Sequence, residues 1–267
     1  MEDEREVSSE DVEKDVILVV EDNPDVRKYI RGPLEADYNV VEAADGREGI
    51  ERAKEIIPDL IISDVMMPHV DGYQLCDTLK KDVNTSHIPI VLLTAKASAE
   101  SIIAGLETGA DDYITKPFNT KILLTRIKSL IDLRRQLQEK IQREMTLQPT
   151  EIAVSSVDQE FMQELKAAIE KNMSDEEFGV DELAKALYMS RPTLNRKIRA
   201  LTGESTNQFI QSYRLKRAAQ LLKANFGNVT DVAFEVGFST SAYFTRCFKE
   251  KFHQLPHTFQ ASETSEQ

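Results

Sequence analysis

Carboxylates stand at the ends of two short apolar segments of this sequence. Glu21 and Asp22 follow the run VILVV, and Asp64 follows the run DLIIS. If both runs are strands of one parallel sheet, their carboxyl ends share the edge at which such sheets bind ligands. Three carboxylates gathered there would repel one another unless a divalent cation lay between them. All-oxygen ligation suits Mg²⁺, which keeps several waters and can bind a phosphate, so the sequence predicts a Mg²⁺ site.

Two further polar residues follow later apolar runs and would complete a phosphate pocket. Thr94 lies at the end of IPIVLLTA, and Lys116 follows DDYIT. A lysine cation and a threonine hydroxyl could neutralise or hydrogen-bond the oxygens of a phosphoryl group while the Asp64 carboxylate attacks phosphorus. Taken singly, these residues have simpler interpretations, because a strand-end Asp is more often a cap or turn residue and Lys-Pro is usually a loop. Together they predict that Asp64 is a phosphoacceptor.

The order of the segments predicts the domain that positions these residues. Apolar runs at VILVV, YNVVEA, DLIIS, IPIVLLTA and DDYIT alternate with amphipathic stretches at residues 24–35, 46–57, 73–79 and 99–106 and precede a helical pattern from Asn119. Continuous apolar strands joined by helices indicate a parallel sheet covered on both faces. The predicted class is α/β, a doubly wound (βα)5 domain over residues 15–135 that follows an acidic tail over residues 1–14.

Four of these segments, VVEDN, IISDVMMPHVDG, VLLTA and GADDYITKPF, together resemble the receiver domain of bacterial two-component response regulators. The resemblance implies that Asp22 and Asp64 bind Mg²⁺ directly, together with the backbone carbonyl of Met66, and that Glu21 acts through water. Glu21 departs from the family, in which many members have Asp at this place, and the longer side chain should alter the reach to the metal.

The same resemblance implies roles for the residues around the phosphoryl group. Lys116 would pair with it, Thr94 would be the switch hydroxyl, and Tyr113 would turn inward after Thr94, although Tyr113 alone reads as a core aromatic. Phosphatases of the haloacid dehalogenase type also phosphorylate a strand-end Asp, but they need a second Asp two positions later as a proton donor. Met66 occupies that position here, which disfavours turnover of an outside substrate.

The helical pattern that begins at Asn119 outruns the α/β domain. Four-and-three spacing relates Leu123, Ile127, Leu130, Leu137 and Ile141, with Arg134 interrupting the seam. The helix is either a short dimerising coiled coil or one that packs its first half on the sheet and its second half on neighbouring residues. Pro149 and small polar residues then break the period, so residues 136–157 are predicted to be a helical extension and a linker.

Residues 158–261 have helical patterns without convincing strands and predict an all-α domain, followed by a tail over residues 262–267. The segment VDELAKALYMSRPTLNRKIRALTG predicts a helix-turn-helix, with Ser190 as the N-cap of its second helix and Leu194, Ile198 and Leu201 as the buried stripe. The segment VTDVAFEVGFSTSAYFTRCFKEKF repeats the arrangement, with Gly237 at the turn. Two such units could enter successive major grooves, about 34 Å apart.

The remaining positions of the two second helices are the candidate DNA contacts. They are Arg191, Thr193, Asn195, Arg196, Lys197 and Arg199 in the first helix and Ser241, Ala242, Arg246 and Lys249 in the second. Asn and Arg carry the donors that read adenine or guanine edges, whereas lysines more naturally meet phosphates. The simpler alternative is a solvated basic face that contacts no DNA.

The helical half resembles the DNA-binding domain of the AraC family of transcription regulators, most specifically in DVAFEVGFSTSAYFTRCFKEKF followed by LP. The resemblance implies base readout by Arg191, Asn195 and Arg196 in the first unit and by Ser241, Ala242 and Arg246 in the second. Two positions depart from the family: Pro192 sits where a bulkier contact residue is often found, and His253 sits where glycine is frequent.

The charge distribution also divides the chain. Residues 1–120 carry 12 Lys and Arg against 27 Asp and Glu, a net charge of −15, whereas residues 190–251 carry 11 against 4, a net charge of +7. An acidic half and a basic segment suggest two domains with different partners. Cys76 and Cys247 lie far apart and match no metal or disulfide spacing. Without 18 consecutive apolar residues, the sequence predicts no transmembrane helix.

Together these features predict a phosphorylation-controlled transcription regulator rather than an enzyme with an outside substrate. A histidine kinase, separate or fused upstream, would donate the phosphoryl group to Asp64 with Mg²⁺, and double-stranded DNA would bind the helical half. Receivers paired along the fourth and fifth predicted helices, with the pairing continued by the 123–141 seam, would give a homodimer. The competing hypothesis is an output through protein–protein interaction. The expected location is the cytoplasm, as a free protein or as the cytoplasmic end of a membrane-bound hybrid sensor, with no membrane contact by this segment.

Overall fold

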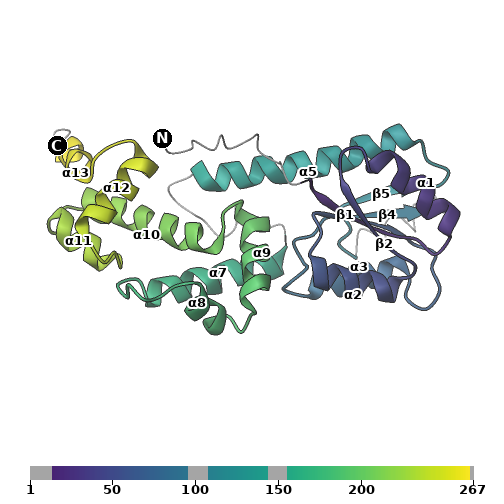
Figure 1. Cartoon of the computed structure of the whole chain (residues 1–267), viewed down its shortest axis with the longest axis horizontal. Helices are drawn as coiled ribbons and strands as arrows, with labels where there is room; N and C mark the ends of the chain where they lie inside the picture. Colours follow the sequence, from purple (N-terminus) through teal and green to yellow (C-terminus); the bar gives the residue numbers. More distant parts are fainter. Residues whose placement is uncertain (1–13, 96–107, 144–154, 265–267) are drawn as a thin grey trace, which may run out of the picture. The chain divides into compact units, whose positions relative to one another are not determined.

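The computed structural model describes residues 14–95, 108–143 and 155–264 (Figure 1). Residues up to Leu79 together with Ile88–Ile131 form one compact unit, and Lys80–His87 together with the residues from Asp132 onward form a second. The helix predicted over residues 99–106, nearly all of the acidic tail and half of the predicted 136–157 segment lie outside the described residues. None of the described helices is both long enough and apolar enough to cross a membrane.

The first unit is built on a five-stranded parallel sheet. Its strands are β1 (Val16–Val20), β2 (Asn39–Ala43), β3 (Leu60–Asp64), β4 (Ile90–Thr94) and β5 (Asp112–Thr115), in the spatial order β2-β1-β3-β4-β5. Every residue of β3 and β4 is buried, because these central strands have neighbours on both sides and helices on both faces. The predicted α/β class, with a doubly wound parallel sheet, is confirmed.

Helices cover the two faces of the sheet in pairs (Figure 1). Helices α1 (Pro24–Leu34) and α5 (Thr120–Arg143) pack their apolar residues on one face, and α2 (Gly46–Ile56) and α3 (Gly72–Lys81) pack on the other. Local signals set where these helices begin: the Asn23 side chain accepts hydrogen bonds from the backbone of Asp25 and Val26, and Asp45 accepts from Glu48. Because the five strands are paired in parallel, their carboxyl ends lie at one edge of the sheet.

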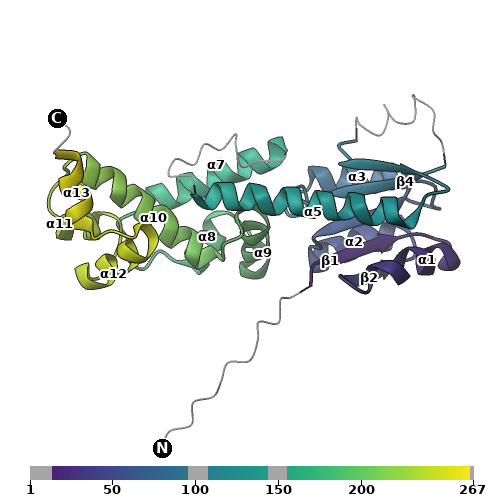
Figure 2. The same cartoon turned by 90° about the horizontal axis from the view of Figure 1, so that it is seen from above.

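Helix α5 is one continuous helix that contributes to both units (Figure 2). Leu123 and Ile127 are fully buried in the core of the first unit, and Leu137 packs against the core of the second. The described members of the four-and-three pattern thus pack against cores within the chain, which supports the packing alternative. The side chain of Ile141 lies outside the described residues.

The second half of α5 also reaches the end of another helix. The last carbonyl groups of an α-helix have no later helical N–H group to accept from, and helix α9 (Arg191–Thr202) ends close to the second half of α5. Arg134 Nε donates to the Ala200 carbonyl at 3.2 Å, and Gln138 Nε2 donates to the same oxygen at 2.7 Å. Side chains of α5 therefore satisfy a backbone acceptor at the C-terminal end of α9.

The second unit is all-helical, as predicted. Besides α9 it contains α7 (Ser156–Lys171), α8 (Val180–Ala186), α10 (Thr206–Lys223), α11 (Val229–Glu235), α12 (Ser241–Phe252) and α13 (Pro256–Thr264). It has two cores, and α10 joins them: Phe209 and Ile210 belong to the core around α7, α8 and α9, whereas Leu215 and Leu222 belong to the core around α11 and α12.

The pairs α8–α9 and α11–α12 repeat one local design. Ser190 caps α9 by accepting from the backbone of Thr193, and Thr240 caps α12 by accepting from the backbone of Tyr243. The turn before each cap contains a left-handed residue, Tyr188 at φ 54° and Gly237 at φ 75°. The two halves of this unit are therefore two helix-turn-helix pairs with equivalent second helices, α9 and α12.

Candidate phosphoacceptor site and nucleic-acid interface

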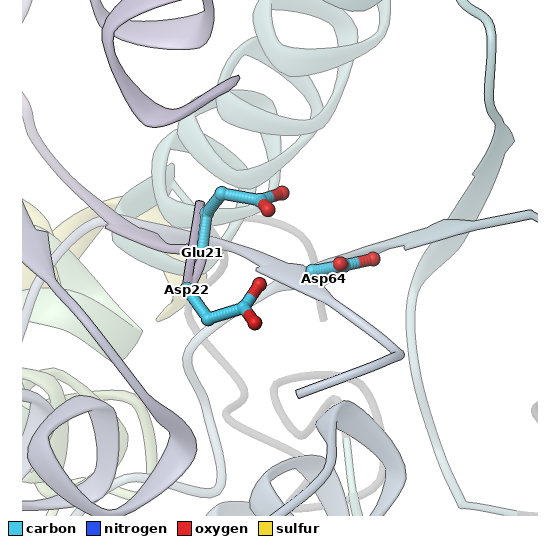
Figure 3. A group of neighbouring side chains, drawn as sticks. All are labelled: Glu21, Asp22 and Asp64. Carbon is cyan, nitrogen blue, oxygen red and sulfur yellow. The ribbon is translucent and has the colours of Figure 1, made fainter. Parts of the chain in front are cut away.

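The three predicted carboxylates meet at the carboxyl edge of the sheet. Strands β1 and β3 are paired in parallel with Val20 beside Ser63, so Glu21 and Asp22 come next to Asp64. Ligand atoms of the three carboxylates lie within 4.8 Å of one another (Figure 3). Glu21 and Asp64 are buried, whereas Asp22 is exposed. The cluster therefore has a deep part inside the fold and one carboxylate open to solvent.

Lys116 lies directly after β5 and reaches into the same cluster. Its Nζ is 2.7 Å from Glu21 Oε2 and 3.0 Å from Asp64 Oδ2. Burial alone would lower the pKa of Lys116, but hydrogen bonds to Glu21 and Asp64 outweigh it and raise that pKa. Burial, together with the nearby Asp64 charge, raises the pKa of Glu21 even though Lys116 opposes the shift. One ammonium group therefore lies between two carboxylates and remains protonated.

The donor set fits a magnesium ion. Three carboxylates and one ammonium leave two negative charges in the cluster, and all its ligand atoms are carboxylate oxygens. Such a hard, anionic and partly open oxygen site is what Mg²⁺ prefers. Met66, two residues after Asp64, is 65% exposed.

The two predicted switch residues occupy neighbouring strands. Thr94 is the last residue of β4, is buried, and lies beside Thr115 in the register of β4 and β5. Tyr113 lies beside Leu92 in the same register and packs against the core on the α2–α3 face. Burial raises the pKa of Tyr113 to about 12. The aromatic side chain is therefore directed into the fold, where it remains neutral.

Gly72 is a site residue whose role the sequence reasoning did not assign. A Cβ added to it would lie 2.3 Å from the carbonyl oxygen of Asp64 and 2.9 Å from Cα of Val65. The first residue of α3 is therefore in close backbone contact with the end of β3. The Asp-Gly pair at residues 71 and 72 was the available signal, because a glycine beside a strand end often marks a close backbone approach.

The candidate DNA contacts on α9 and α12 divide by exposure. Six are exposed, namely Arg191, Arg196, Arg199, Ala242, Arg246 and Lys249, and three are partly buried, namely Thr193, Asn195 and Ser241. Asn195 is engaged inside the unit, since its Oδ1 accepts from the Thr206 backbone at 3.0 Å and from the Thr206 hydroxyl at 3.2 Å. The arginines of both helices remain the best placed for contact with a ligand.

Lys197 does not lie where the phosphate-contact prediction needs it. It is fully buried, its Nζ is 2.6 Å from Asp158 Oδ1, and it lies 4.9 Å from the ring centroid of Phe161. Burial lowers the pKa of Lys197, although Asp158 beside it favours the charged form. Lys197 therefore joins α9 to α7 in the interior, and its predicted contact with a phosphate is corrected.

Comparison with known proteins identifies both units. A family model described as the response regulator receiver domain matches residues 17–128, and one described as a helix-turn-helix domain matches residues 183–262. Histidine kinase P4 of Formosa agariphila is 43% identical over 248 residues, which are 93% of this chain and 18% of that protein. The transcriptional regulator RpaA of Synechocystis is 40% identical over 116 residues, 43% of this chain and 48% of that protein.

Solved structures of receiver domains are also similar to part of this chain. The receiver domain of sensor histidine kinase PA1611 from Pseudomonas aeruginosa is 32% identical with a TM-score of 0.42, over 45% of this chain and 98% of that one. The chain spans less than half the length of the two curated relatives named above. Both predicted resemblances are confirmed by the family matches: this chain carries a response regulator receiver domain followed by an AraC-type helix-turn-helix domain.

Proposed function

We propose that this chain is a phosphorylation-controlled transcription regulator. A histidine kinase donates a phosphoryl group to Asp64, and the helical unit binds specific double-stranded DNA through α9 and α12. The observation that carries the proposal is the cluster of Glu21, Asp22, Asp64 and Lys116 at the carboxyl edge of the sheet, in a chain that also carries a helix-turn-helix domain.

The chemistry follows from the positions of these groups. A carboxylate oxygen of Asp64 attacks the phosphorus of a phosphohistidine, a P–O bond forms, the P–N bond breaks, and the imidazole leaves with the electron pair. Bound Mg²⁺ would be held by Asp22 and Asp64, with Glu21 through water, and would neutralise charge on the phosphoryl oxygens. Lys116, now 3.0 Å from Asp64, is positioned to pair with one of those oxygens.

The response would pass through Thr94 and Tyr113, which lie on β4 and β5. The Thr94 hydroxyl, at the end of the strand beside β3, is the group that would bond a phosphoryl oxygen on Asp64. Tyr113 lies on the neighbouring strand with its ring in the core, so movement near Thr94 would change its packing. The phosphorylated and free states would then differ in the surface they offer.

The phosphoacceptor test uses a small phosphodonor, acetyl phosphate, with Mg²⁺ and intact-mass spectrometry on the full chain. We expect wild type to gain one phosphoryl group and Asp64→Asn to gain none. Asp25→Asn, which changes an exposed carboxylate in the first turn of α1, is the matched control and should behave as wild type. Equal labelling of Asp64→Asn and wild type would reject Asp64 as the acceptor.

The DNA test is selection of duplexes from a random pool by the full chain, followed by titration at several salt concentrations. We expect a recurring sequence to be selected. Arg196→Ala and Arg246→Ala should weaken binding to it, whereas Arg52→Ala, on an exposed face of α2, should not. A chain that enriches no sequence, with phosphorylation intact, would favour the competing output through protein–protein interaction.

A further inference from the structure

We infer that Tyr243 is a positioning residue that holds Arg246 for base readout, so that the sequence preference of the second helix-turn-helix unit depends on both side chains. This inference rests on the proposed DNA-binding function and adds to it a specificity-determining residue. Tyr243 lies on the exposed face of α12, although its position in the sequence gives no sign of a DNA contact.

The tyrosine ring is held from inside the unit. Tyr243 is 42% exposed, yet its ring centroid is 5.7 Å from that of Phe238, which belongs to the core around α11 and α12. Its hydroxyl accepts a hydrogen bond from Gln211 Nε2 at 2.9 Å, and Gln211 also donates to Cys247 Sγ at 3.3 Å. The ring is therefore held by its contact with Phe238 and by its hydroxyl group, with part of its surface left exposed.

Arg246 lies against that ring. Its guanidinium carbon is 5.3 Å from the ring centroid of Tyr243, within the range in which a cation is attracted to an aromatic face. The two residues are three positions apart, so they share one face of α12. An unheld exposed arginine loses much rotamer freedom when it binds, whereas one already stacked on a fixed ring loses less. Its N–H groups could then bond the O6 and N7 atoms of a guanine.

Helix α9 provides an internal comparison, because it has an arginine at the equivalent position but no aromatic residue three positions before it. Counted from the N-caps Ser190 and Thr240, the third residue is Thr193 in α9 and Tyr243 in α12, and the sixth is Arg196 and Arg246. The exposed side chains of α9 include no aromatic residue to stack on Arg196. The two units therefore hold equivalent arginines in different ways, and only α12 should depend on an aromatic support.

A double-mutant cycle in the full chain tests the inference on the duplex that wild type selects. The readout is discrimination, the ratio of the dissociation constant for a duplex substituted at one base pair to that for the selected duplex. The substituted base pair is the one at which Arg246→Ala abolishes discrimination. If the arginine makes two hydrogen bonds to that pair, discrimination by wild type should be about 5- to 150-fold. In the wild-type background, Tyr243→Leu should lower that discrimination about three- to tenfold. In the Arg246→Ala background, the same change should have less than about a twofold effect, because Tyr243 acts through Arg246 and the two effects are therefore not additive.

Two variants separate support by the ring from a loss of folding. Tyr243→Phe keeps the ring and should retain discrimination within about twofold. Arg246→Lys keeps the charge but cannot stack as a plane, so it should lower discrimination while preserving the salt dependence. Phe226→Leu, which changes a 48% exposed aromatic residue between α10 and α11, is the matched control and should leave this base pair unaffected. Thermal unfolding by circular dichroism shows which variants fold.

The outcomes are distinct. Unchanged discrimination in a folded Tyr243→Leu would overturn the inference, as would an equal loss with and without Arg246, since Tyr243 would then act by a contact of its own. If Tyr243→Leu does not fold, equal discrimination by Arg246→Lys and wild type overturns it instead. A wild-type chain that selects no sequence would overturn the proposed DNA-binding function first, and the inference with it.

Discussion

The ion pair between Lys197 and Asp158 allows a sharp prediction about the helical unit. Both side chains are fully buried, and Lys197 Nζ lies 2.6 Å from Asp158 Oδ1. At that distance and an effective dielectric constant of about 20, the attraction is about 6 kcal/mol, most of which offsets the desolvation of the two ions. Lys197→Met keeps the apolar stem but leaves the Asp158 charge buried without its cation. We therefore expect a loss of about 3–5 kcal/mol in the stability of this unit.

Hydrogen exchange by mass spectrometry is the assay, because it reports the opening of α7 and α9 separately from the sheet. The expected loss corresponds to amide exchange that is faster by about a hundredfold or more in these helices. Lys185→Met, an exposed lysine on α8, is the matched control and should change exchange little. Exchange in α7 and α9 that is alike in the two variants would refute the reasoning.

A paired substitution separates the charge from the packing. Asp158→Leu combined with Lys197→Met removes both ions, so it should recover much of the stability lost in the single variant. The same double variant should leave the salt dependence of DNA binding unchanged, because Lys197 is interior. Arg196→Ala should instead reduce that slope by about 0.9 if its guanidinium meets a phosphate. A reduced slope in the double variant would return Lys197 to the DNA-contact set.

Three further changes have defined outcomes. Glu21→Gln should weaken Mg²⁺ binding by about tenfold or more in a calorimetric titration; unchanged affinity would remove Glu21 from the metal site. Gly72→Ala places a Cβ 2.3 Å from the carbonyl oxygen of Asp64, so it should lower the free energy of unfolding in urea by about 1–3 kcal/mol. Gly32→Ala, whose Cβ would meet no atom within 4 Å, should not lower it. Burial, with Arg134, Lys197 and Lys80 nearby, holds the pKa of His87 well below 6.5. This contribution to stability is present above pH 6.5 and is lost as the pH falls toward the lower folded pKa. Between about pH 7.5 and about pH 5.5, wild type should therefore lose more stability than His87→Gln, by up to about 1.4 kcal/mol. Equal losses would contradict this.

The strand-end residues were predictable because the rule that places them needs only local patterns. An apolar run followed by Asp64 or Lys116 predicts both a strand and the edge at which its last residue lies, and parallel pairing then brings the groups together. The structure reproduces this grouping to hydrogen-bond distance for Lys116, Glu21 and Asp64.

The errors concern partners that are distant in sequence. Lys197 was read as a basic surface residue, but its partner Asp158 lies 39 residues away in another helix, and nothing local to α9 signals it. Tyr243 is not among the predicted DNA contacts, and its contact with Gln211 depends on how α10 lies against α12. The second half of α5 left two alternatives open, since Leu137 suits a coiled coil as well as a core.

The bonds from Arg134 and Gln138 to the Ala200 carbonyl affect how this protein can be divided for experiments. A fragment that starts at Ser155, just before α7, would keep every helix of the helix-turn-helix pairs but lose the donors that satisfy the end of α9, together with the apolar cover from Leu137. Such a fragment should fray at the last turn of α9 and expose an apolar surface. A fragment that starts near Asp132 retains both, so it is the better starting point for crystals with DNA.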